Sequence, residues 1–409
     1  IFIKNINIPA HLFMSVIVAL FMGLTVSAEE IIRDQKILKR EAFLHLHRSS
    51  YLISKMGILF TISAIQTLLF VVVGSAILEI KGMILVHWGI LFTVSCFANM
   101  LGLNISSAFN SAVTIYILIP ILLIPQLILS GVVVKFDKLN PTIGDPETVP
   151  FVGDLMASRW AFEASMVAQF KNNPYEKEFY EHEKVIADAD YKRIYYIPTL
   201  ETKLDYINLN YQNPGVDPKE ISSRLSLVQR EIENELRDIG KQHFLEVALL
   251  QPATYDSSVF RKTKEFLSIL KQYYTNRSTS ANKAREEKVD EIAARLGGRK
   301  EFENYRNAYQ NEAIAAMVKN QDEAVRIIES KGRLIQKIYP IYKDPERDHL
   351  IDFDAQFYLP SKHFLRATID TLYFNLSVIW SMSVLLYIML YFDVFRKIIG
   401  GLENFSLRK

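Results

Sequence analysis

Five long apolar segments constrain the fold of this 409-residue chain more than any other feature. A helix needs about 20 apolar residues to cross the hydrocarbon core of a bilayer. Segments of this kind lie at about 8–28, 53–78, 83–104, 111–134 and 369–393. Because several of them are almost free of charge, burial inside a soluble protein explains them poorly. The sequence therefore predicts a mainly α, polytopic membrane protein.

Composition divides the chain into apolar and polar parts. Residues 1–134 contain four of the predicted spans, and residues 367–409 contain the last span and a short tail. Residues 135–366, between them, have the composition of an ordinary soluble domain. The formal net charge is only +2, so no overall electric field favours a nucleic-acid partner.

The basic residues predict the orientation of the spans, because Lys and Arg concentrate in short cytoplasmic loops. The segment 29–55 and the C-terminal tail are both rich in them, as follows: Arg33, Lys36, Lys39, Arg40, Arg48 and Lys55 in the first, and Arg396, Lys397, Arg408 and Lys409 in the second. We expect both in the cytoplasm. Alternation then places residues 79–82 and the whole of 135–366 outside.

The first residue and the single cysteine add two expectations. The chain begins at Ile1, which alternation places outside, and no signal-peptide pattern precedes the first apolar segment. One further span upstream would return the true N-terminus to the cytoplasm, so we expect a six-span unit of which five are present. Cys96 lies in an apolar segment and has no partner for an intrachain disulfide. A bacterial inner-membrane protein with a periplasmic domain fits this composition.

The loop 29–52 combines charge with apolar periodicity. Glu29 and Glu30 open it and cations follow, which suits the dipole of a helix. Its apolar residues recur at amphipathic spacing at Ile32, Ile37, Leu38, Phe43 and Leu44. Such a helix would lie along the inner membrane surface. A basic loop that only enforces orientation is the alternative.

Several short motifs resemble the membrane domain of ABC-2 type exporters of the G (white/pleiotropic drug resistance) type. They are Glu29-Glu30, Arg33 and Lys39-Arg40-Glu41, then Tyr51 to Lys55, then Pro120, Pro125 and Leu129-Ser130-Gly131, and finally the segment 158–164, which reads SRWAFEA. The last is similar to the family's R-[YW]-A-x-E-A segment. The resemblance covers about residues 8–170 and 367–395.

The resemblance implies the second to sixth spans of a six-span ABC-2 fold. It also implies a dimer that exports a substrate across the cytoplasmic membrane in an ATP-driven cycle. The sequence does not identify the substrate: apolar residues on the path suit a lipid or another amphiphile, but the same residues would also simply pack a helical bundle. Residues implied to couple the membrane domain to an ATPase are Glu29, Glu30, Arg33, Lys39, Arg40 and Glu41. Residues implied to border the transport path are Phe13, Ile17, Phe21, Thr114, Leu118 and Gln126.

ATP chemistry must come from elsewhere. The chain contains neither G-x-x-x-x-G-K-[ST] nor G-x-G-x-x-G, the glycine-rich patterns that hold nucleotide phosphates. We therefore expect no catalytic residue and no cofactor site in this chain. ATP and magnesium would bind an ATP-binding cassette, either fused upstream or on a separate subunit.

The segment 135–366 departs from the family, in which the corresponding outer loop is short. Periodicity predicts helices over 218–240, 283–296 and 300–338, ended by Gly240, Gly297 and Pro340, with Tyr195–Ile197 as a weak strand candidate. These helices would form a bundle or an extended coiled coil. We expect the domain to dock an outer protein partner or to cover the exit.

Other polar motifs have simple explanations. Glu181-His182-Glu183 could offer metal ligands, but adjacent residues do not share a helix face, which favours a solvated stretch. Gln66, Asn99 and Gln126 lie within predicted spans, where they either bond neighbouring helices or border the transport path.

Three classes of function remain open: an exporter subunit, a non-transporting assembly or signalling protein whose outer helices bind a partner, and a channel. An ATP-binding cassette upstream or in an adjacent gene would support the first, and its absence from both places would exclude it.

Overall fold

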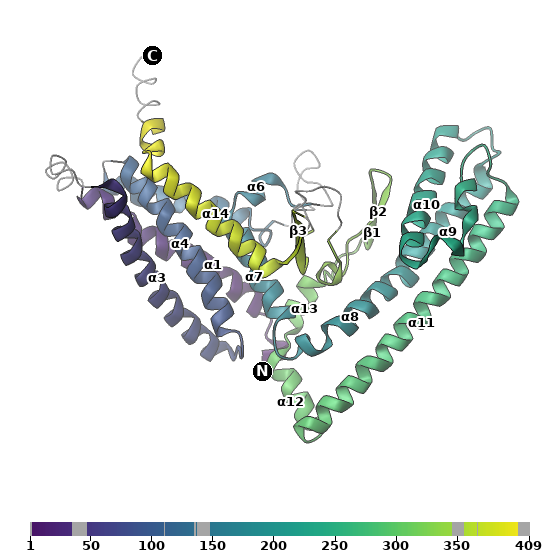
Figure 1. Ribbon diagram of the computed structural model, residues 1–409, viewed down its shortest axis with the longest axis horizontal. Coiled ribbons are helices and arrows are strands. Elements are labelled where there is room, and N and C mark those ends of the chain that lie inside the picture. Colours follow the sequence, from purple (N-terminus) through teal and green to yellow (C-terminus); the bar gives the residue numbers. More distant parts are fainter. Residues whose placement is uncertain are drawn as a thin grey trace, which may run out of the picture. The chain divides into compact units, whose positions relative to one another are not determined.

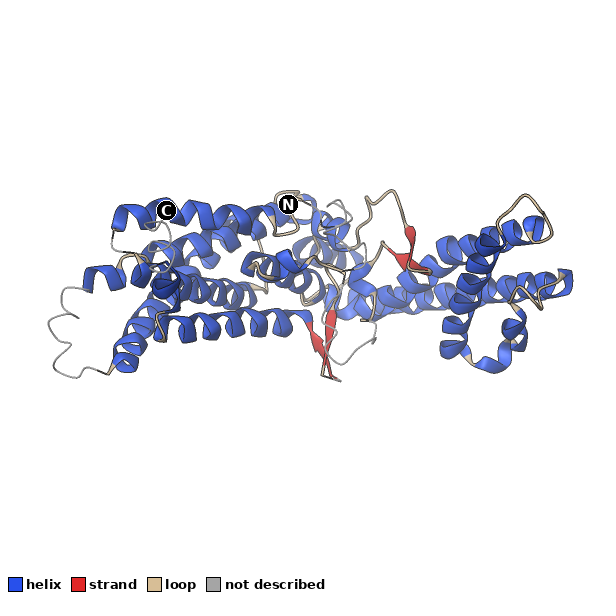
Figure 2. Cartoon of the chain, turned by 90° about the horizontal axis from the view of Figure 1, so that it is seen from above, coloured by secondary structure: helices blue, strands red, loops and turns tan. Residues whose placement is uncertain are grey.

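The computed structural model describes residues 2–34, 47–109, 111–134, 136, 148–345, 356–365 and 367–399. The described chain is overwhelmingly helical and carries two short hairpins (Figure 2). It divides into two compact units. The membrane unit comprises Ile1–Lys177, Asn304–Val318 and Asp344–Lys409. The inserted unit comprises Glu178–Glu303 and Lys319–Lys343.

Four described helices of the membrane unit are long and apolar enough to cross a bilayer. They are α1 (Ile8–Ser27, continuing as a helical stretch to Asp34), α3 (Arg48–Leu78), α4 (Ile84–Ala108) and α14 (Thr371–Tyr391). The predicted span at 111–134 is the shorter helix α5 (Ala112–Ile128), with 17 residues. It ends early because the chain turns at Gly131, whose φ is +83°.

Helix α4 is the centre of the membrane unit and packs against α1, α3 and α14 (Figure 1). Two glycines permit the close approach of α1 and α4. A Cβ added to Gly23 would lie 2.6 Å from the carbonyl oxygen of Ser95, and one added to Gly102 would lie 2.0 Å from Oγ of Ser27. Small residues hold membrane helices together in this way because lipid provides no hydrophobic force between them.

A short helix, α7 (Ala157–Lys171), packs against α1, α4 and α14. Every residue from Ala157 to Phe170 is buried, as expected of a helix surrounded by protein. It follows the one-turn helix α6 (Phe151–Asp154). The antiparallel hairpin of β3 (Ser361–Phe364) and β4 (Ala367–Asp370) leads into α14.

The chain returns to the membrane unit midway through the large polar segment. Helix α12 (Arg299–Tyr309) crosses from one unit to the other, and α13 (Glu312–Val318) packs against α1 and α7. Asn311 Nδ2 donates to the carbonyl oxygens of Phe2, at 2.7 Å, and Asn5, at 3.0 Å. Phe2 belongs to a 3₁₀ turn, Phe2–Lys4. The polar segment is therefore not one uninterrupted insertion.

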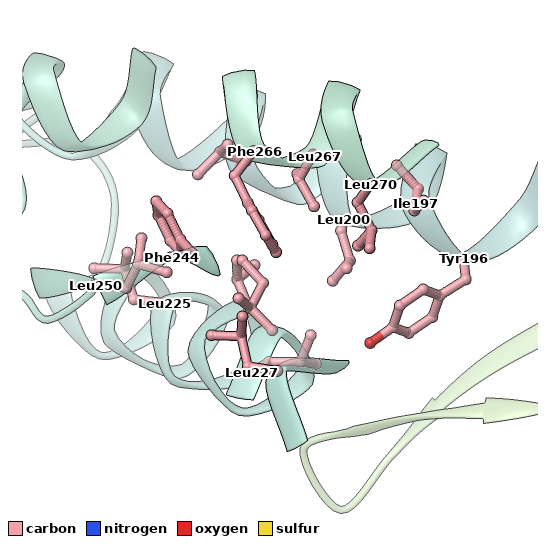
Figure 3. Close-up of a cluster of buried hydrophobic side chains, with 14 of the residues drawn as sticks. Tyr196, Ile197, Leu200, Leu225, Leu227, Phe244, Leu250, Phe266, Leu267 and Leu270 are labelled. Atoms are coloured by element: carbon pink, nitrogen blue, oxygen red, sulfur yellow. The ribbon is translucent and has the colours of Figure 1, made fainter. Parts of the chain in front are cut away.

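The inserted unit is built on long helices. Its elements are most of α8 (Glu176–Tyr191), a π-helical turn (Lys192–Tyr196), α9 (Ile197–Asn210), α10 (Pro218–Ile239), 3₁₀ turns at Lys241–His243, Leu245–Leu249 and Pro340–Tyr342, α11 (Ser257–Leu296), and the hairpin of β1 (Ile327–Ser330) and β2 (Arg333–Gln336). Helices α9, α10 and α11 share one core of buried side chains (Figure 3). Leu200, Leu225 and Leu267 are at most 1% exposed there.

Two of the helices predicted for this unit are present in the structure, one of them with a different start. The prediction for 218–240 is confirmed by α10, which Asp217 caps and Gly240 ends. The helix predicted at 283–296 ends as expected at Gly297, but it begins much earlier, at Ser257.

Two predictions for this unit are wrong. The helix predicted over 300–338 is broken into α12, α13 and the β1–β2 hairpin. Oδ1 of Asn311 accepts from the amide of Ile314 and so starts α13 as a separate helix, while Asn320 and Gly332 adopt positive φ at turns after α13 and within the hairpin. The strand candidate at Tyr195–Ile197 is helical, since the π-turn joins α8 directly to α9.

Candidate functional site

A charged cluster, here called the coupling cluster, joins the end of the first helical stretch to the start of α3. Lys55 Nζ lies 2.7 Å from Glu30 Oε2 and 2.8 Å from Asp34 Oδ2. The hydroxyl of Tyr51 donates to Asp34 at 3.1 Å, and Arg33 pairs with Glu30 at 2.7 Å. Side chains of Lys55, Glu30 and Asp34 are less than one-fifth exposed. Water therefore screens these pairs less than fully exposed pairs, which contribute about 0–1 kcal/mol.

The backbone beside the cluster is fastened to α4. Oγ of Ser106 accepts hydrogen bonds from the amides of Ile31 and Ile32, both at 3.1 Å. Nearby, Arg48 at the start of α3 pairs with Asp393 and donates to the carbonyl oxygen of Leu390 at 2.9 Å. Residues at this end of the chain are therefore bonded to α3, α4 and α14.

The predicted coupling residues are only partly described. Glu30 and Arg33 belong to the coupling cluster. Glu29 lies in the same helical stretch, directly before Glu30. Lys39, Arg40 and Glu41 lie outside the described residues. Site prediction from sequence omitted the acceptor Asp34 and the distant Ser106, because a loop read by itself does not reveal its tertiary partners.

The six predicted path residues lie on α1 and α5, which contact each other. Phe13 and Ile17 are buried, and the ring of Phe13 meets that of Phe162 edge-on with centroids 5.6 Å apart. Phe21 is 48% exposed, Thr114 is exposed and Leu118 is half-buried. The structure thus leaves one part of this set on the surface and packs the other inside.

Two of the polar residues predicted within the spans are engaged between helices. Oε1 of Gln126 accepts from the amide of Ser158 at 3.0 Å, which fastens α5 to α7. Nδ2 of Asn99 donates to Oγ of Ser63 at 2.7 Å, which joins α4 to α3. Both side chains bond neighbouring helices, the first of the two expectations.

A second group of charges, here called the buried ion cluster, consists of Arg159, Glu163, Lys362 and Asn375. Oε2 of Glu163 lies 2.9 Å from Nζ of Lys362 and accepts from Nδ2 of Asn375, also at 2.9 Å. A guanidinium nitrogen of Arg159, one turn away on α7, lies 3.5 Å from the same oxygen. The four side chains are at most 1% exposed, so bulk water screens none of their charges.

The electrostatics of this cluster follow from burial and from its two cations. Burial alone would raise the pKa of Glu163, but the charges of Lys362 and Arg159 outweigh it and hold this pKa below its usual value. Burial, followed by repulsion from Arg159, lowers the pKa of Lys362 to about 8. The guanidinium carbon of Arg159 also lies 3.8 Å from the ring centroid of Trp160, a favourable cation–π geometry.

The sequence contained half of this cluster. Arg159 and Glu163 stand one turn apart in the SRWAFEA segment, but Lys362 and Asn375 come about 200 residues later. Among the described residues, no group of three or more His, Cys, Asp and Glu could hold a metal ion. Glu183, of the Glu181-His182-Glu183 triplet, pairs with Lys319 at 3.1 Å.

The four long apolar helices define a multi-pass membrane protein. Residues 1–170 match the family model of the ABC-2 type transporter, so this region is an ABC-2 type membrane domain. Such domains are typically permease components and pair with ATP-binding cassette domains. The matched region ends within α7, and most of the inserted unit follows it. No curated protein and no solved structure matches the chain significantly.

Proposed function

We propose that this chain is the membrane component of an ATP-driven exporter of the G type within the ABC-2 family. The observation that carries the proposal is the ABC-2 match over the segment that contains α1, α3, α4, α5 and the coupling cluster. The partner would be an ATP-binding cassette that binds ATP and magnesium, and a second copy would complete the transport path. The substrate would be a lipid or another amphiphile.

The proposed topology has five spans in this chain, with α5 as the fourth of them. Its 17 residues measure about 26 Å at 1.5 Å per residue. That is slightly less than the hydrocarbon core of about 30 Å, and a bilayer adapts to such a mismatch by local thinning. Contact between Arg48 and Asp393 supports placing the segment 29–55 and the C-terminal tail on one side. The basic residues make that side cytoplasmic, with the inserted unit periplasmic.

In this proposal, ATP-driven closure of two cassettes would act on the loop 29–52, and the coupling cluster would pass the movement to α3 and α4. Its contacts supply the mechanical links: Lys55 to Glu30, and Ser106 to the backbone of Ile31 and Ile32. The inserted unit would bind an outer protein partner or cover the exit.

A test can avoid the unknown substrate by measuring movement directly. In the reconstituted transporter with its cassette, Cys96→Ser and Phe21→Cys would place one spin label on the exposed part of α1 in each copy. We expect ATP to change the distance between the two labels. Two charge-reversing variants, Arg40→Glu with Glu41→Lys and Glu30→Lys alone, should each abolish this ATP-driven change in distance. ATP hydrolysis should persist in both.

The matched control reverses every charge of the coupling cluster. The variant with Glu30→Lys, Arg33→Glu, Asp34→Lys and Lys55→Glu restores opposite charges at all three ion pairs and should restore the movement. Reversal of the Lys262–Glu246 pair of the inserted unit, which is 2.9 Å apart, should have no effect. An unchanged ATP response in all reversed variants would refute the coupling role.

A further inference from the structure

An apolar groove of about 290 Å³ opens between α3 and α14. Its walls are two stripes of side chains at helical spacing, one on α3 and one on α14, and Met100 of α4 completes the lining. The lining residues are Ile53, Met56 and Phe60 on α3, Trp380, Ser383, Val384 and Tyr387 on α14, and Met100 on α4. Its volume is close to the lower end of the range for small-molecule pockets, about 300–1,000 Å³.

The groove exists because α3 and α14 both pack on α4 and make little contact with each other. The rings of Phe60 and Trp380 meet edge-on at one end, with centroids 6.1 Å apart. At the other end, Arg48 reaches from α3 to Asp393 and to the carbonyl oxygen of Leu390. These two contacts therefore bridge α3 and α14 near the two ends of the groove, and its remaining side is open.

The open side faces the hydrocarbon of the bilayer, because α3 and α14 are membrane-spanning helices. Ile53 and Val384 are 59% and 55% exposed at the groove. An empty groove would forfeit the dispersion contacts that its lining could make. The acyl chain of a lipid is the apolar group that surrounds the protein at this depth.

The charges next to the groove select among lipids. Arg48 is paired with Asp393, but two more cations, Arg396 and Lys397, follow at the same end of α14 and are exposed. This end of the groove therefore carries a net positive charge. A phosphate group at the membrane surface would neutralise it while the chain of the same molecule enters the groove.

We propose that the groove binds an acyl chain of an anionic phospholipid of the membrane, with its headgroup held at Arg396 and Lys397. Apolar contact by itself gives little preference, because lipid tails are as apolar as the groove. Selectivity therefore comes from the headgroup, because basic residues near the membrane surface attract anionic lipids. This site depends neither on the direction of transport nor on the identity of the substrate.

Trp380 is a built-in reporter of occupancy, since the chain contains only three tryptophans. The test reconstitutes the full protein in vesicles that contain phosphatidylglycerol or phosphatidylcholine with brominated acyl chains, which quench indole fluorescence on contact. The difference between the wild type and Trp380→Phe isolates quenching at the groove. We expect brominated phosphatidylglycerol to quench Trp380 at a lower mole fraction than brominated phosphatidylcholine.

Two matched pairs of variants test the two halves of the site. Val384→Phe fills the groove and should abolish the preference, whereas Val73→Phe, at an equally exposed position of α3 outside the groove, should preserve it. Arg396→Gln with Lys397→Gln should reduce the preference for phosphatidylglycerol by about fivefold per charge, which corresponds to about 1 kcal/mol each. Removing Lys4 and Lys81, exposed at the opposite ends of the helices, should change nothing.

Equal quenching by the two lipids would overturn the proposal, because it would show only general contact with the bilayer. The proposal would also be overturned if Val384→Phe and Val73→Phe showed the same preference for phosphatidylglycerol. Either result would leave the proposed exporter function untouched, and loss of the ATP-driven movement would leave this lipid site untouched.

Discussion

At the scale of single residues, Glu163 is the acidic member of the buried ion cluster. Its carboxylate faces Lys362 and Arg159 in a wholly buried setting. Removing one partner of a buried ion pair costs about 3–5 kcal/mol, because the remaining charge has no compensation. We therefore expect Glu163→Gln to lower the unfolding free energy of the detergent-solubilised protein by that amount, as measured by denaturant titration.

A second substitution decides whether the loss reflects the charge balance. Adding Lys362→Met to Glu163→Gln removes the orphaned cation and should recover part of the stability. Glu246→Gln, which breaks the partly exposed pair with Lys262, should cost far less, because water screens that pair. Full additivity of the two buried substitutions would contradict the coupling inferred here.

Lys362 also predicts a dependence on pH. Its pKa is lowered from 10.5 to about 8 in the folded protein. Between pH 8 and 10.5 the unfolded chain binds more protons at this residue than the folded one, so stability rises with pH in this window. The stability of the wild type relative to Lys362→Met should increase by up to about 3 kcal/mol. Thermal unfolding of both proteins at pH 7.5, 9 and 10.5 measures this difference in stability. A stability difference that does not change with pH would argue against a buried, titrating lysine.

At the scale of elements, the contact between α1 and α4 depends on small residues. Adding a methyl group at Gly23 places it 2.6 Å from the carbonyl oxygen of Ser95, so one helix must move. We expect Gly23→Ala to cost about 1–3 kcal/mol through overpacking. Gly57→Ala on α3 is the matched control, since no atom lies within 4 Å of its added Cβ, and Ala favours helix over Gly. Melting temperatures of the two variants should therefore move in opposite directions, and equal shifts would refute this packing argument.

The helices differ in how well the sequence predicted them. Those with one continuous apolar stripe or a clear cap, such as α10 with Asp217 and Gly240, were placed correctly. The first half of α11 was missed. The region 319–338 was assigned to a helix although it forms a hairpin, since apolar residues such as Ile328 and Ile335 suit either structure when spacing is the only evidence.

At the scale of the whole molecule, α13 ties the polar segment back to the membrane unit through Asn311. The chain ends left by removing the inserted unit are close together. Tyr305 OH donates to the carbonyl oxygen of Pro174 at 2.6 Å, and the amide of Tyr339 donates to that of Lys319 at 2.8 Å. We therefore expect a variant with short Gly-Ser linkers in place of 179–302 and 320–338 to keep a folded membrane unit.

The informative comparison removes α13 as well. A variant with one linker in place of 178–343 loses the bonds from Asn311 and the packing of α13 on α1 and α7. It should melt at a lower temperature and be cut faster by protease than the variant that retains Asn304–Val318. Equal stability of the two would show that α13 contributes nothing to the membrane unit.

The sequence by itself determined the membrane class, the order of the apolar segments and the ABC-2 resemblance, because these depend on local composition and spacing. It also supplied Arg159 and Glu163, which stand one helical turn apart. Only the tertiary structure decided that Lys362 and Asn375 complete their cluster, that Ser106 holds the coupling end, and that α13 returns to the membrane unit. These contacts join residues from about 75 to more than 300 positions apart, and periodicity along a chain has no information about such pairs.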